Sequence, residues 1–255
     1  MACPSAAQDK GAPNHPGYAF GTPAGEALFA IAAGLSNLTS YAPQRSTGWG
    51  PDAPHAYNRA LDRVSDVTGA YGGAAIGMLA GLGLEIGYFE AAGVRGAAVY
   101  AQRTALVDLE SVLFTRGVVD GLKRLTGRCR PRYFVDGACV SEVRDAFPSG
   151  HTAPMGALAA SRLVIAAQSS GPWEYRWGAF GISETLAIAT AVLRVKAGMH
   201  SWSDVAGGFL IGHAVGALVA LAHPMQAVDP ADRREGAASS AIGRGGFGLT
   251  WSGAF

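Results

Sequence analysis

The sequence predicts an all-α fold, a bundle of about six helices that is embedded in a membrane or associated with one. Charged residues make up only 15% of the 255 residues and hydrophobic ones 49%, where charged residues usually reach about 25%. Long stretches are uniformly apolar or have apolar residues at helical spacing. Outside the last residues of the chain, no region shows the alternation that is typical of strands.

The charge balance limits the partners of the chain. Lys and Arg number 20 and Asp and Glu 19, so the net charge is +1. This balance argues against a nucleic-acid binder and against a polybasic membrane surface, so any anion site must be local. The N-terminus has no basic segment followed by an apolar stretch, so no signal peptide is expected, although an uncleaved first helix would still be compatible with export.

Composition divides the chain into three parts. Residues 1–23 are rich in Pro, Gly and Ala without periodicity, and they predict a flexible leader. Residues 24–225 form the helical domain. Residues 226–255 are a Gly/Ser-rich tail, whose final FGLTWSGAF alternates large apolar residues with small or polar ones and predicts a short strand.

The first helices are expected at 25–38 and, after a Pro/Gly-rich loop, at 57–67. Between Asp66 and Glu85 lie 18 residues without a charge. At about 1.5 Å per residue, a helix of this length crosses most of the ~30 Å hydrocarbon core of a membrane. The alternative is a glycine-rich helix inside a soluble bundle.

Two glycine ladders predict close helix packing. One recurs every four residues within the first candidate span: Gly69, Gly73, Gly77 and Gly81. The other is Gly208, Gly212 and Gly216, in the uncharged segment 205–223, which is the second candidate span. Such ladders leave a smooth groove where another helix can approach, as in small-xxx-small membrane packing.

The three remaining helices carry charges. Residues 96–125 predict a long amphipathic helix. Its charged side chains would be costly against lipid, so the helix is expected inside the bundle or at its water-exposed end. The helix after residue 152 contains Arg162. The helix at 173–199 contains Glu184 and Arg194, so neither of these two is expected to be a clean membrane span.

The cysteines Cys129 and Cys139 bracket the loop RPRYFVDGA, and Cys3 lies in the leader. The pair could close a small disulfide ring in an oxidising compartment, or remain two free thiols in a cytosolic loop. Their spacing is not a zinc pattern.

The stretch FPSGHT, residues 147–152, places Ser149, Gly150 and His151 directly before a helix. The first N–H groups of a helix lack partners and the helix dipole is positive there, so this position attracts anions. A lone Ser-Gly-His cluster is a weak signal, because Pro and Ser commonly begin helices.

Three cations accompany this stretch and strengthen the signal. Lys123 and Arg130 precede it and Arg194 follows it. These side chains could neutralise the oxygens of a phosphate, with Arg supplying paired planar donors, while Ser149 and Gly150 add neutral donors. Cations at a helix end could instead be solvated or cap its last carbonyls.

The chemistry is predicted to rest on two histidines and a carboxylate. Asp204, hydrogen-bonded to one nitrogen of His200, would leave the other nitrogen free to attack phosphorus. His151 would protonate the leaving alkoxide and then activate water. No metal or other cofactor is required, because the cations stabilise the charge. The alternatives are an interhelical hydrogen bond for His200 and a Ser-x-x-Asp capping box for Asp204.

The three blocks closely resemble the signature motifs of the type 2 phosphatidic acid phosphatase and vanadium-dependent haloperoxidase superfamily, in order and in spacing. The blocks are Lys123-x6-Arg130-Pro131, then Pro148-Ser149-Gly150-His151, then Arg194-x5-His200-x3-Asp204. The third motif of the family usually begins Ser-Arg, whereas Leu193 precedes Arg194 here, which removes one hydroxyl near the phosphate.

The resemblance implies a helical bundle with the active site at one end and a metal-independent phosphatase that acts through a phosphohistidine. Members hydrolyse lipid phosphates, isoprenoid diphosphates or small soluble phosphates, so the expected partners are a phosphorylated substrate, preferably lipid-linked, and a membrane, with no nucleic acid. In membrane members the site faces the periplasm or exterior, and a soluble periplasmic form is the other option. The oligomeric state does not follow from the sequence.

Two alternative functions are a haloperoxidase and a catalytically silent membrane scaffold. A haloperoxidase would hold vanadate in the same cage, but such enzymes are usually much longer and no second signature for halide chemistry is present. A catalytically silent membrane scaffold would not be expected to keep His151, His200 and Asp204 intact. Outside the motifs, His213 is predicted to be an interior hydrogen-bonding group, and His223 to complement the dipole at a helix end.

Overall fold

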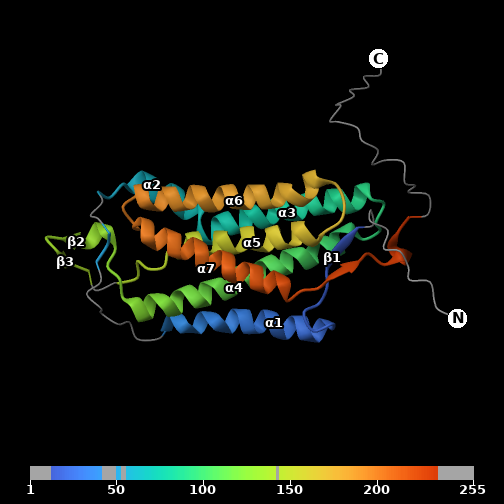
Figure 1. The fold of residues 1–255 in the computed structure, drawn as a ribbon, viewed down its shortest axis with the longest axis horizontal. Helices are drawn as coiled ribbons and strands as arrows, with labels where there is room; N and C mark the ends of the chain where they lie inside the picture. Colours follow the sequence, from blue (N-terminus) through green and yellow to red (C-terminus); the bar gives the residue numbers. More distant parts are fainter. Residues whose placement is uncertain (1–12, 42–49, 53–55, 142–143, 235–255) are drawn as a thin grey trace, which may run out of the picture.

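The computed structural model describes residues 13–41, 50–52, 56–141 and 144–234. These residues form an elongated bundle of α-helices with short 3₁₀ segments and two small sheets, which confirms the predicted all-α fold (Figure 1). The helices are α1 Pro23–Leu35, α2 Arg59–Thr68, α3 Ala70–Ala91, α4 Ala97–Thr126, α5 Thr152–Gln168, α6 Trp173–Lys196 and α7 Trp202–Leu221. The strand predicted in the C-terminal tail lies outside the described residues.

The helix ends follow from local sequence. Thr22 begins α1, with its hydroxyl accepting from the Gly25 N–H at 3.0 Å, and Asn58 caps α2 by accepting from two backbone N–H groups at 3.1 Å. Gly127 ends α4 in the left-handed conformation, with φ at 52°. Glycine reaches this region without steric cost, so the chain can turn there towards the next segment.

A helix break at Gly69 lies near the start of the first predicted membrane span, so α3 begins at Ala70 within the uncharged segment 67–84. Gly69 is extended, with φ −108° and ψ −177°, and it separates α2 from α3. Glycine has a low helix propensity, and a Cβ at this position would lie 2.7 Å from the Ser65 carbonyl oxygen. The break lets α2 turn its polar residues to one end of the bundle.

The other glycines of the two ladders pack against α5, which confirms the predicted grooves. On α3, a Cβ at Gly77 would lie 2.6 Å from the Leu158 side chain. On α7, a Cβ at Gly212 would lie 2.1 Å from the Ala153 carbonyl oxygen, and one at Gly216 equally close to that of Ala157. Helix α5 also contacts α4 and α6, so it runs through the middle of the bundle (Figure 1).

We expect Gly212→Ala to lower the stability of the bundle. The new methyl group would meet backbone rather than a flexible side chain, so α5 and α7 must separate, at a cost of about 1–3 kcal/mol. Gly181→Ala in α6 is the matched control, because nothing lies within 4 Å of its Cβ position and the change should stabilise the helix by about 0.5–1 kcal/mol. Thermal unfolding in detergent distinguishes the two, and equal melting temperatures would contradict the packing.

Short strands tie the two ends of the described chain together. Strand β1, Asn14–Pro16, pairs antiparallel with β4, Met225–Ala227. Residues 14–16 of the predicted leader and 226–227 of the predicted tail thus belong to one small sheet, and Val228 is buried. Three-residue strands whose partners lie about 200 positions away give no local periodicity. A separate hairpin, β2 Phe134–Val135 with β3 Ala138–Cys139, lies at the opposite end of the bundle.

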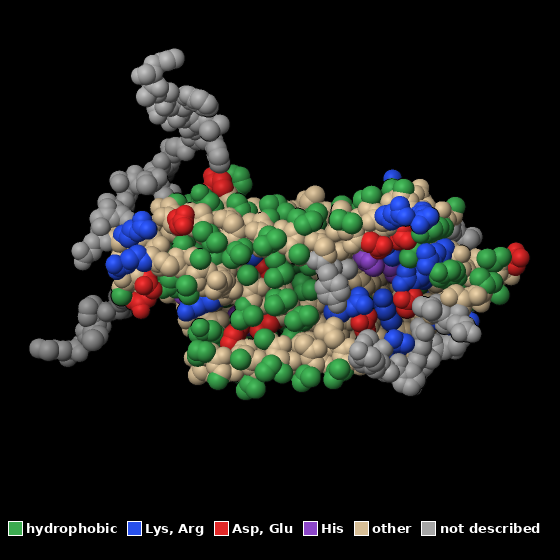
Figure 2. All heavy atoms as spheres, turned by 180° about the vertical axis from the view of Figure 1, so that it is seen from behind, with side chains coloured by type: hydrophobic (Ala, Val, Ile, Leu, Met, Phe, Trp, Pro, Cys, Tyr) green, Lys and Arg blue, Asp and Glu red, His purple; other side chains and the backbone are tan. Residues whose placement is uncertain are grey.

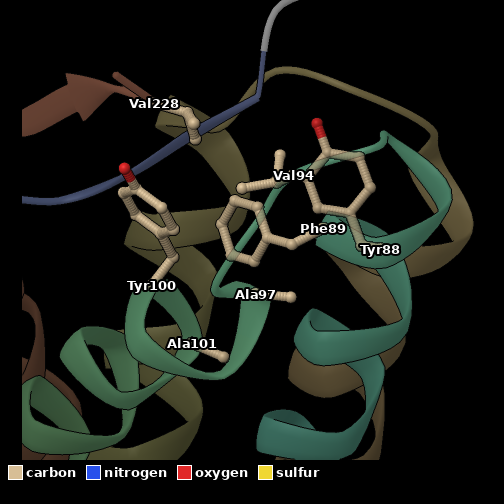
Figure 3. Packing of buried hydrophobic residues seen from close by; sticks show 7 residues of the cluster. All are labelled: Tyr88, Phe89, Val94, Ala97, Tyr100, Ala101 and Val228. Carbon is tan, nitrogen blue, oxygen red and sulfur yellow. The ribbon is translucent and has the colours of Figure 1, made fainter. Parts of the chain in front are cut away.

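An aromatic cluster closes the end of the bundle that holds β1 and β4 (Figure 3). Phe89 and Tyr100 face each other from α3 and α4, with ring centroids 5.7 Å apart. Val94, in the turn between these helices, is buried against them, and Val228 covers the cluster from the segment after β4. Burial of Val228 at 1% exposure explains why the chain remains packed beyond residue 225.

Within the described part of the chain, three helical segments are long and apolar enough to cross a membrane: Arg59–Ala91, Trp173–Lys196 and Trp202–Leu221. The first and third were predicted. The segment Trp173–Lys196 was not expected to be a clean span because it contains Glu184 and Arg194, but its length and mean hydropathy suffice for one. Large apolar side chains such as Leu79, Leu210 and Leu218 face outwards. Figure 2 shows hydrophobic side chains over the middle of the bundle and charged ones gathered towards its ends. These features support association with a membrane.

Candidate active site

The three predicted blocks meet at one end of the bundle. Helices α4 and α6 end there, α5 and α7 begin there, and α2 and the β2–β3 hairpin lie beside them (Figure 1). Basic, acidic and histidine side chains gather at this end in Figure 2. The first block begins in the last turn of α4, the second precedes α5, and the third runs from the last turn of α6 into the first turn of α7. Alternating helix directions thus bring all three blocks together.

Burial and the positive charges of Lys123, Arg130 and Arg194 lower the pKa of both His151 and His200. Burial lowers the pKa of His200 well below its usual value, and the charges of Arg130, Arg194 and Lys123 lower it further. Burial and the same three cations, with Arg194 first among them, lower the pKa of His151 to about 2. Both imidazoles are therefore neutral at pH 7 in the absence of a bound anion.

His200 lies at the buried centre of the site. Its side chain is fully enclosed, and neither ring nitrogen has a hydrogen-bond partner among the described residues. Nδ1 lies 3.7 Å from Asp204 Oδ2, which is beyond hydrogen-bond length. Nδ1 thus faces the carboxylate, and the role of Asp204 in orienting the ring stays a prediction.

Asp204 is held in place by two other groups. Its Oδ2 accepts a hydrogen bond from the Ser201 N–H at 2.8 Å, which completes the capping box of α7. Its Oδ1 accepts from Arg128 Nη1 at 2.7 Å. The capping alternative that the sequence offered is thus realised, and the carboxylate still lies beside the imidazole.

Arg130 and Lys123 form the cationic side of the site. Arg130 donates through Nε and Nη2 to the two oxygens of Asp145, at 2.6 and 2.7 Å. Burial raises the pKa of Asp145, but the hydrogen bonds and charge of Arg130 outweigh it and hold that pKa well below its usual range. Lys123 is 8% exposed, and burial lowers its pKa to about 8.

Arg194 is held by acidic residues of α2 that the sequence reasoning missed. Its Nη1 lies 2.8 Å from Oδ1 of both Asp62 and Asp66, and it donates to Ser65 at 3.1 Å. Asp66 Oδ1 also lies 3.0 Å from His151 Nε2, so this carboxylate bridges a phosphate-site cation and the predicted acid. The three residues share one face of α2, and their i, i+3, i+4 spacing was the signal that could have found them.

Ser149 and Gly150 occupy the start of α5 as predicted. Ser149 is buried, its N–H donates to the Asp204 carbonyl oxygen at 2.9 Å, and its hydroxyl accepts from Thr152 Oγ1 at 3.1 Å. A Cβ at Gly150 would lie 2.9 Å from Lys123 Nζ. The absence of a side chain at this position lets the ammonium group approach the backbone N–H groups at the helix start.

Arg128 is a further residue that the sequence reasoning missed. It is 1% exposed, and besides Asp204 it binds the Asp52 carboxylate at 2.6 Å and the Gly50 carbonyl oxygen at 2.8 Å. It thereby links the segment before α2 to the start of α7. The motif spacing assigns Lys123 and Arg130 to the site, and nothing in the sequence indicated that Arg128, two residues before Arg130, also belongs to it.

A disulfide joins Cys129 and Cys139 and closes the ring around the β2–β3 hairpin. Of the two alternatives that the sequence left open, the structure has the disulfide. The bridge begins at the residue before Arg130, so it constrains the segment that carries this cation.

Part of the chain matches a known protein family, and a solved structure is similar to the chain. The model of the PAP2 superfamily matches residues 105–227, a segment that contains all eight predicted site residues. The crystal structure of a transmembrane PAP2 type phosphatidylglycerolphosphate phosphatase from Bacillus subtilis is 19% identical, with a TM-score of 0.43, and the match covers 79% of this chain and 87% of that chain. No curated protein matches the chain.

Proposed function

Residues 105–227 belong to the PAP2 superfamily, and from this premise we propose that the chain is a phosphatase that hydrolyses a lipid-linked phosphomonoester or diphosphate through a phosphohistidine. One observation carries the proposal. Two neutral, desolvated histidines lie among three cations at the N-terminus of a buried helix. Neutral imidazole is the form that can attack phosphorus, and the cations supply the charge that a phosphoryl group needs.

The substrate phosphate would bind between the cations. Arg130 and Arg194 offer guanidinium donors, Lys123 a point charge, and Ser149 and Gly150 the donors of the helix start. A phosphate dianion entering this space would also raise the proton affinity of His151, because the negative charge offsets the cations that now lower it. Binding would therefore prepare His151 to act as an acid.

The reaction would proceed in two displacements. His200 Nε2, on the ring side away from Asp204, forms a bond to phosphorus while the bond to the leaving oxygen breaks, and that oxygen takes a proton from His151. His151, now neutral, then removes a proton from water as the hydroxide displaces His200 and phosphate is formed. Asp204 lies beside Nδ1, where its charge would stabilise the positive imidazole of the intermediate.

The surface of the bundle supports a lipid-linked substrate. Trp202 at the site end of α7 is 55% exposed, and Trp173 and Trp177 are exposed at the far end of α6. Exposed Trp residues at both ends of apolar helices match the aromatic belts of membrane proteins. The 20 residues of α7 span about 30 Å, the thickness of the hydrocarbon core. The site would thus lie at one membrane surface, where a phosphate headgroup sits.

The disulfide supports a site that faces the periplasm or exterior. Cys129 and Cys139 lie at the site end, and disulfides persist on oxidising sides of membranes. The same end carries the charged residues of the site, which need contact with water.

A phosphate-release panel tests the proposal. The purified chain, in detergent and in lipid vesicles, is given phosphatidic acid, an isoprenyl diphosphate, a sugar phosphate and a nucleotide, with orthovanadate as a competing anion. We expect release of inorganic phosphate, faster from the lipid-linked substrates, and competitive inhibition by vanadate, which mimics the transition state. Hydrolysis that persists in excess vanadate would contradict the site, and faster hydrolysis of the soluble substrates would contradict the lipid preference.

Activity should fall above about pH 8. Burial depresses the pKa of Lys123 to about 8, so the ammonium is present below this pH and is lost above it. We expect kcat/KM to decline about tenfold per pH unit on the alkaline side. Lys123→Arg keeps a cation to much higher pH, so its profile should lack this decline even if its maximum is lower. An alkaline limb that is unchanged in Lys123→Arg would assign it to another group.

A further inference from the structure

A second cluster of buried ionisable residues lies away from the active site. Glu26 of α1, Glu110 of α4 and His223 just after α7 converge, and one ligand atom of each lies within 4.8 Å of the others. The imidazole Nε2 is 3.0 Å from Glu26 Oε1 and 3.0 Å from Glu110 Oε2. The side chains are at most 5% exposed. The sequence had predicted only that His223 complements the helix dipole.

The protonation of His223 is fixed on one side. Nδ1 lies 2.8 Å from the Val219 carbonyl oxygen, and because a carbonyl only accepts, Nδ1 carries the proton. In a neutral imidazole the lone pair of Nε2 then points at two carboxylate oxygens. Such an arrangement requires a cation between the groups or a second proton on the ring. A histidine whose other nitrogen donates to a backbone carbonyl is also the usual form of a metal ligand.

The two carboxylates lack enough partners for their burial. Glu26 Oε2 accepts from the Ala19 N–H at 2.7 Å, which orients Oε1 into the cluster. Neither oxygen of Glu110 accepts a well-formed hydrogen bond in the described part of the chain. No Lys or Arg in the described part of the chain forms an ion pair with Glu26 or Glu110. A buried carboxylate without donors or a counterion is unstable, so the cluster lacks positive charge.

We propose that Glu26 Oε1, Glu110 Oε2 and His223 Nε2 bind a divalent transition-metal ion, with zinc as the best match. One imidazole and two carboxylates are ligands that zinc accepts, at about 2.0–2.2 Å from the metal. Tetrahedral ligands at that distance lie about 3.3–3.6 Å apart, so side-chain shifts of a few tenths of an ångström from the present 3.0 Å between Nε2 and each carboxylate oxygen would admit the ion. A 2+ ion offsets both carboxylate charges, and water or Glu110 Oε1 would complete the coordination.

The metal would have a structural role. Glu110 and Lys123 are 13 positions apart on α4, about 20 Å along the helix axis, so the ion is remote from the phosphate site. Helix α1 rests mainly on α4 and exposes Leu28, Ile31 and Leu35. An ion shared by α1, α4 and the end of α7 would fasten this peripheral helix to the bundle. Binding only in the folded state would raise stability.

Metal content tests the proposal on the full chain purified in detergent. The protein is stripped with a chelator, loaded with zinc, desalted and analysed by mass spectrometry for metals. We expect about one zinc per chain in the wild type and below about 0.1 in Glu110→Gln and in His223→Gln, because loss of one ligand weakens binding more than the 10–100-fold that outer-shell changes cost. Loading with cobalt should give visible ligand-field absorption in the wild type alone.

Glu184→Gln is the matched control. His213 copies the geometry of His223, with Nδ1 2.9 Å from the Phe209 carbonyl oxygen and Nε2 3.1 Å from Glu184, but with a single carboxylate. This variant should keep its zinc. If Glu110→Gln does not fold, Glu26→Gln on the peripheral helix α1 replaces it and should likewise lose zinc.

Two results would overturn the proposal. A zinc-loaded wild type that retains no metal, and whose melting temperature is the same with zinc and with chelator, would mean that a protonated His223 holds the cluster. Equal zinc content in Glu110→Gln, Glu26→Gln and the control would place the metal elsewhere in the chain.

Discussion

His200→Ala is expected to lower kcat at least about 10⁴-fold, the order seen when a covalent nucleophile is removed. Of the described histidines, His151 is the other one affected by the same cations, but its Nε2 lies 3.0 Å from Asp66 Oδ1 and it is needed as the acid. The loss should be in kcat rather than in KM, since the cations that bind the phosphate remain. The measurement is steady-state phosphate release, with circular dichroism to show that the variant is folded.

His213→Gln is the control for this variant. His213 lies on α7 away from the phosphate site, bonded to Glu184, so its removal should leave turnover unchanged. Acid-labile, base-stable labelling of the wild type by a radioactive phosphoryl donor should disappear in His200→Ala. A folded His200→Ala protein that keeps wild-type turnover would disprove the phosphohistidine mechanism.

His151→Ala is expected to slow turnover by about 10²–10⁴-fold while vanadate inhibition stays within a few-fold of wild type. The imidazole acts on the leaving oxygen and on water, whereas the anion is held mainly by Arg130, Arg194 and Lys123. Loss of vanadate binding together with turnover would make His151 a binding residue instead.

The leaving group separates the two roles of His151. An aryl phosphate such as p-nitrophenyl phosphate needs no proton on its departing oxygen, so the first displacement should remain fast in His151→Ala. Hydrolysis of the intermediate still lacks its base. We therefore expect a burst of about one phenolate per chain followed by slow turnover, and no burst in His200→Ala. A uniform slowing with no burst would contradict this division of labour.

The convergence of the candidate site residues could be predicted from the sequence because they lie at fixed offsets within three short blocks. Lys123, Arg130 and His200 owe their positions to helix ends, and helix ends are readable from composition and caps. The two glycine ladders were readable for the same reason, since their spacing defines one face of a helix.

The residues of the site that could not be predicted from the sequence owe their positions to contacts between distant segments. Asp62 and Asp66 are ordinary surface carboxylates in sequence, and only the turn at Gly69 brings α2 over Arg194. Arg128 pairs with Asp204 and Asp145 pairs with Arg130, in both cases through a loop residue, and a loop has no periodicity to reveal its partner. Strand β1 was missed likewise, because its only signal is a partner at the other end of the chain.

The carboxylates around the cations affect how readily inorganic phosphate leaves the site. Asp145 on Arg130, and Asp62 with Asp66 on Arg194, are internal counterions that make it less costly to keep these guanidinium groups buried when no phosphate is present. An incoming phosphate would therefore compete with anions that are already in place. The same competition weakens the hold on inorganic phosphate once the ester bond is gone, so product would leave readily. If the cations had no such counterions, the site would bind inorganic phosphate too tightly for rapid turnover.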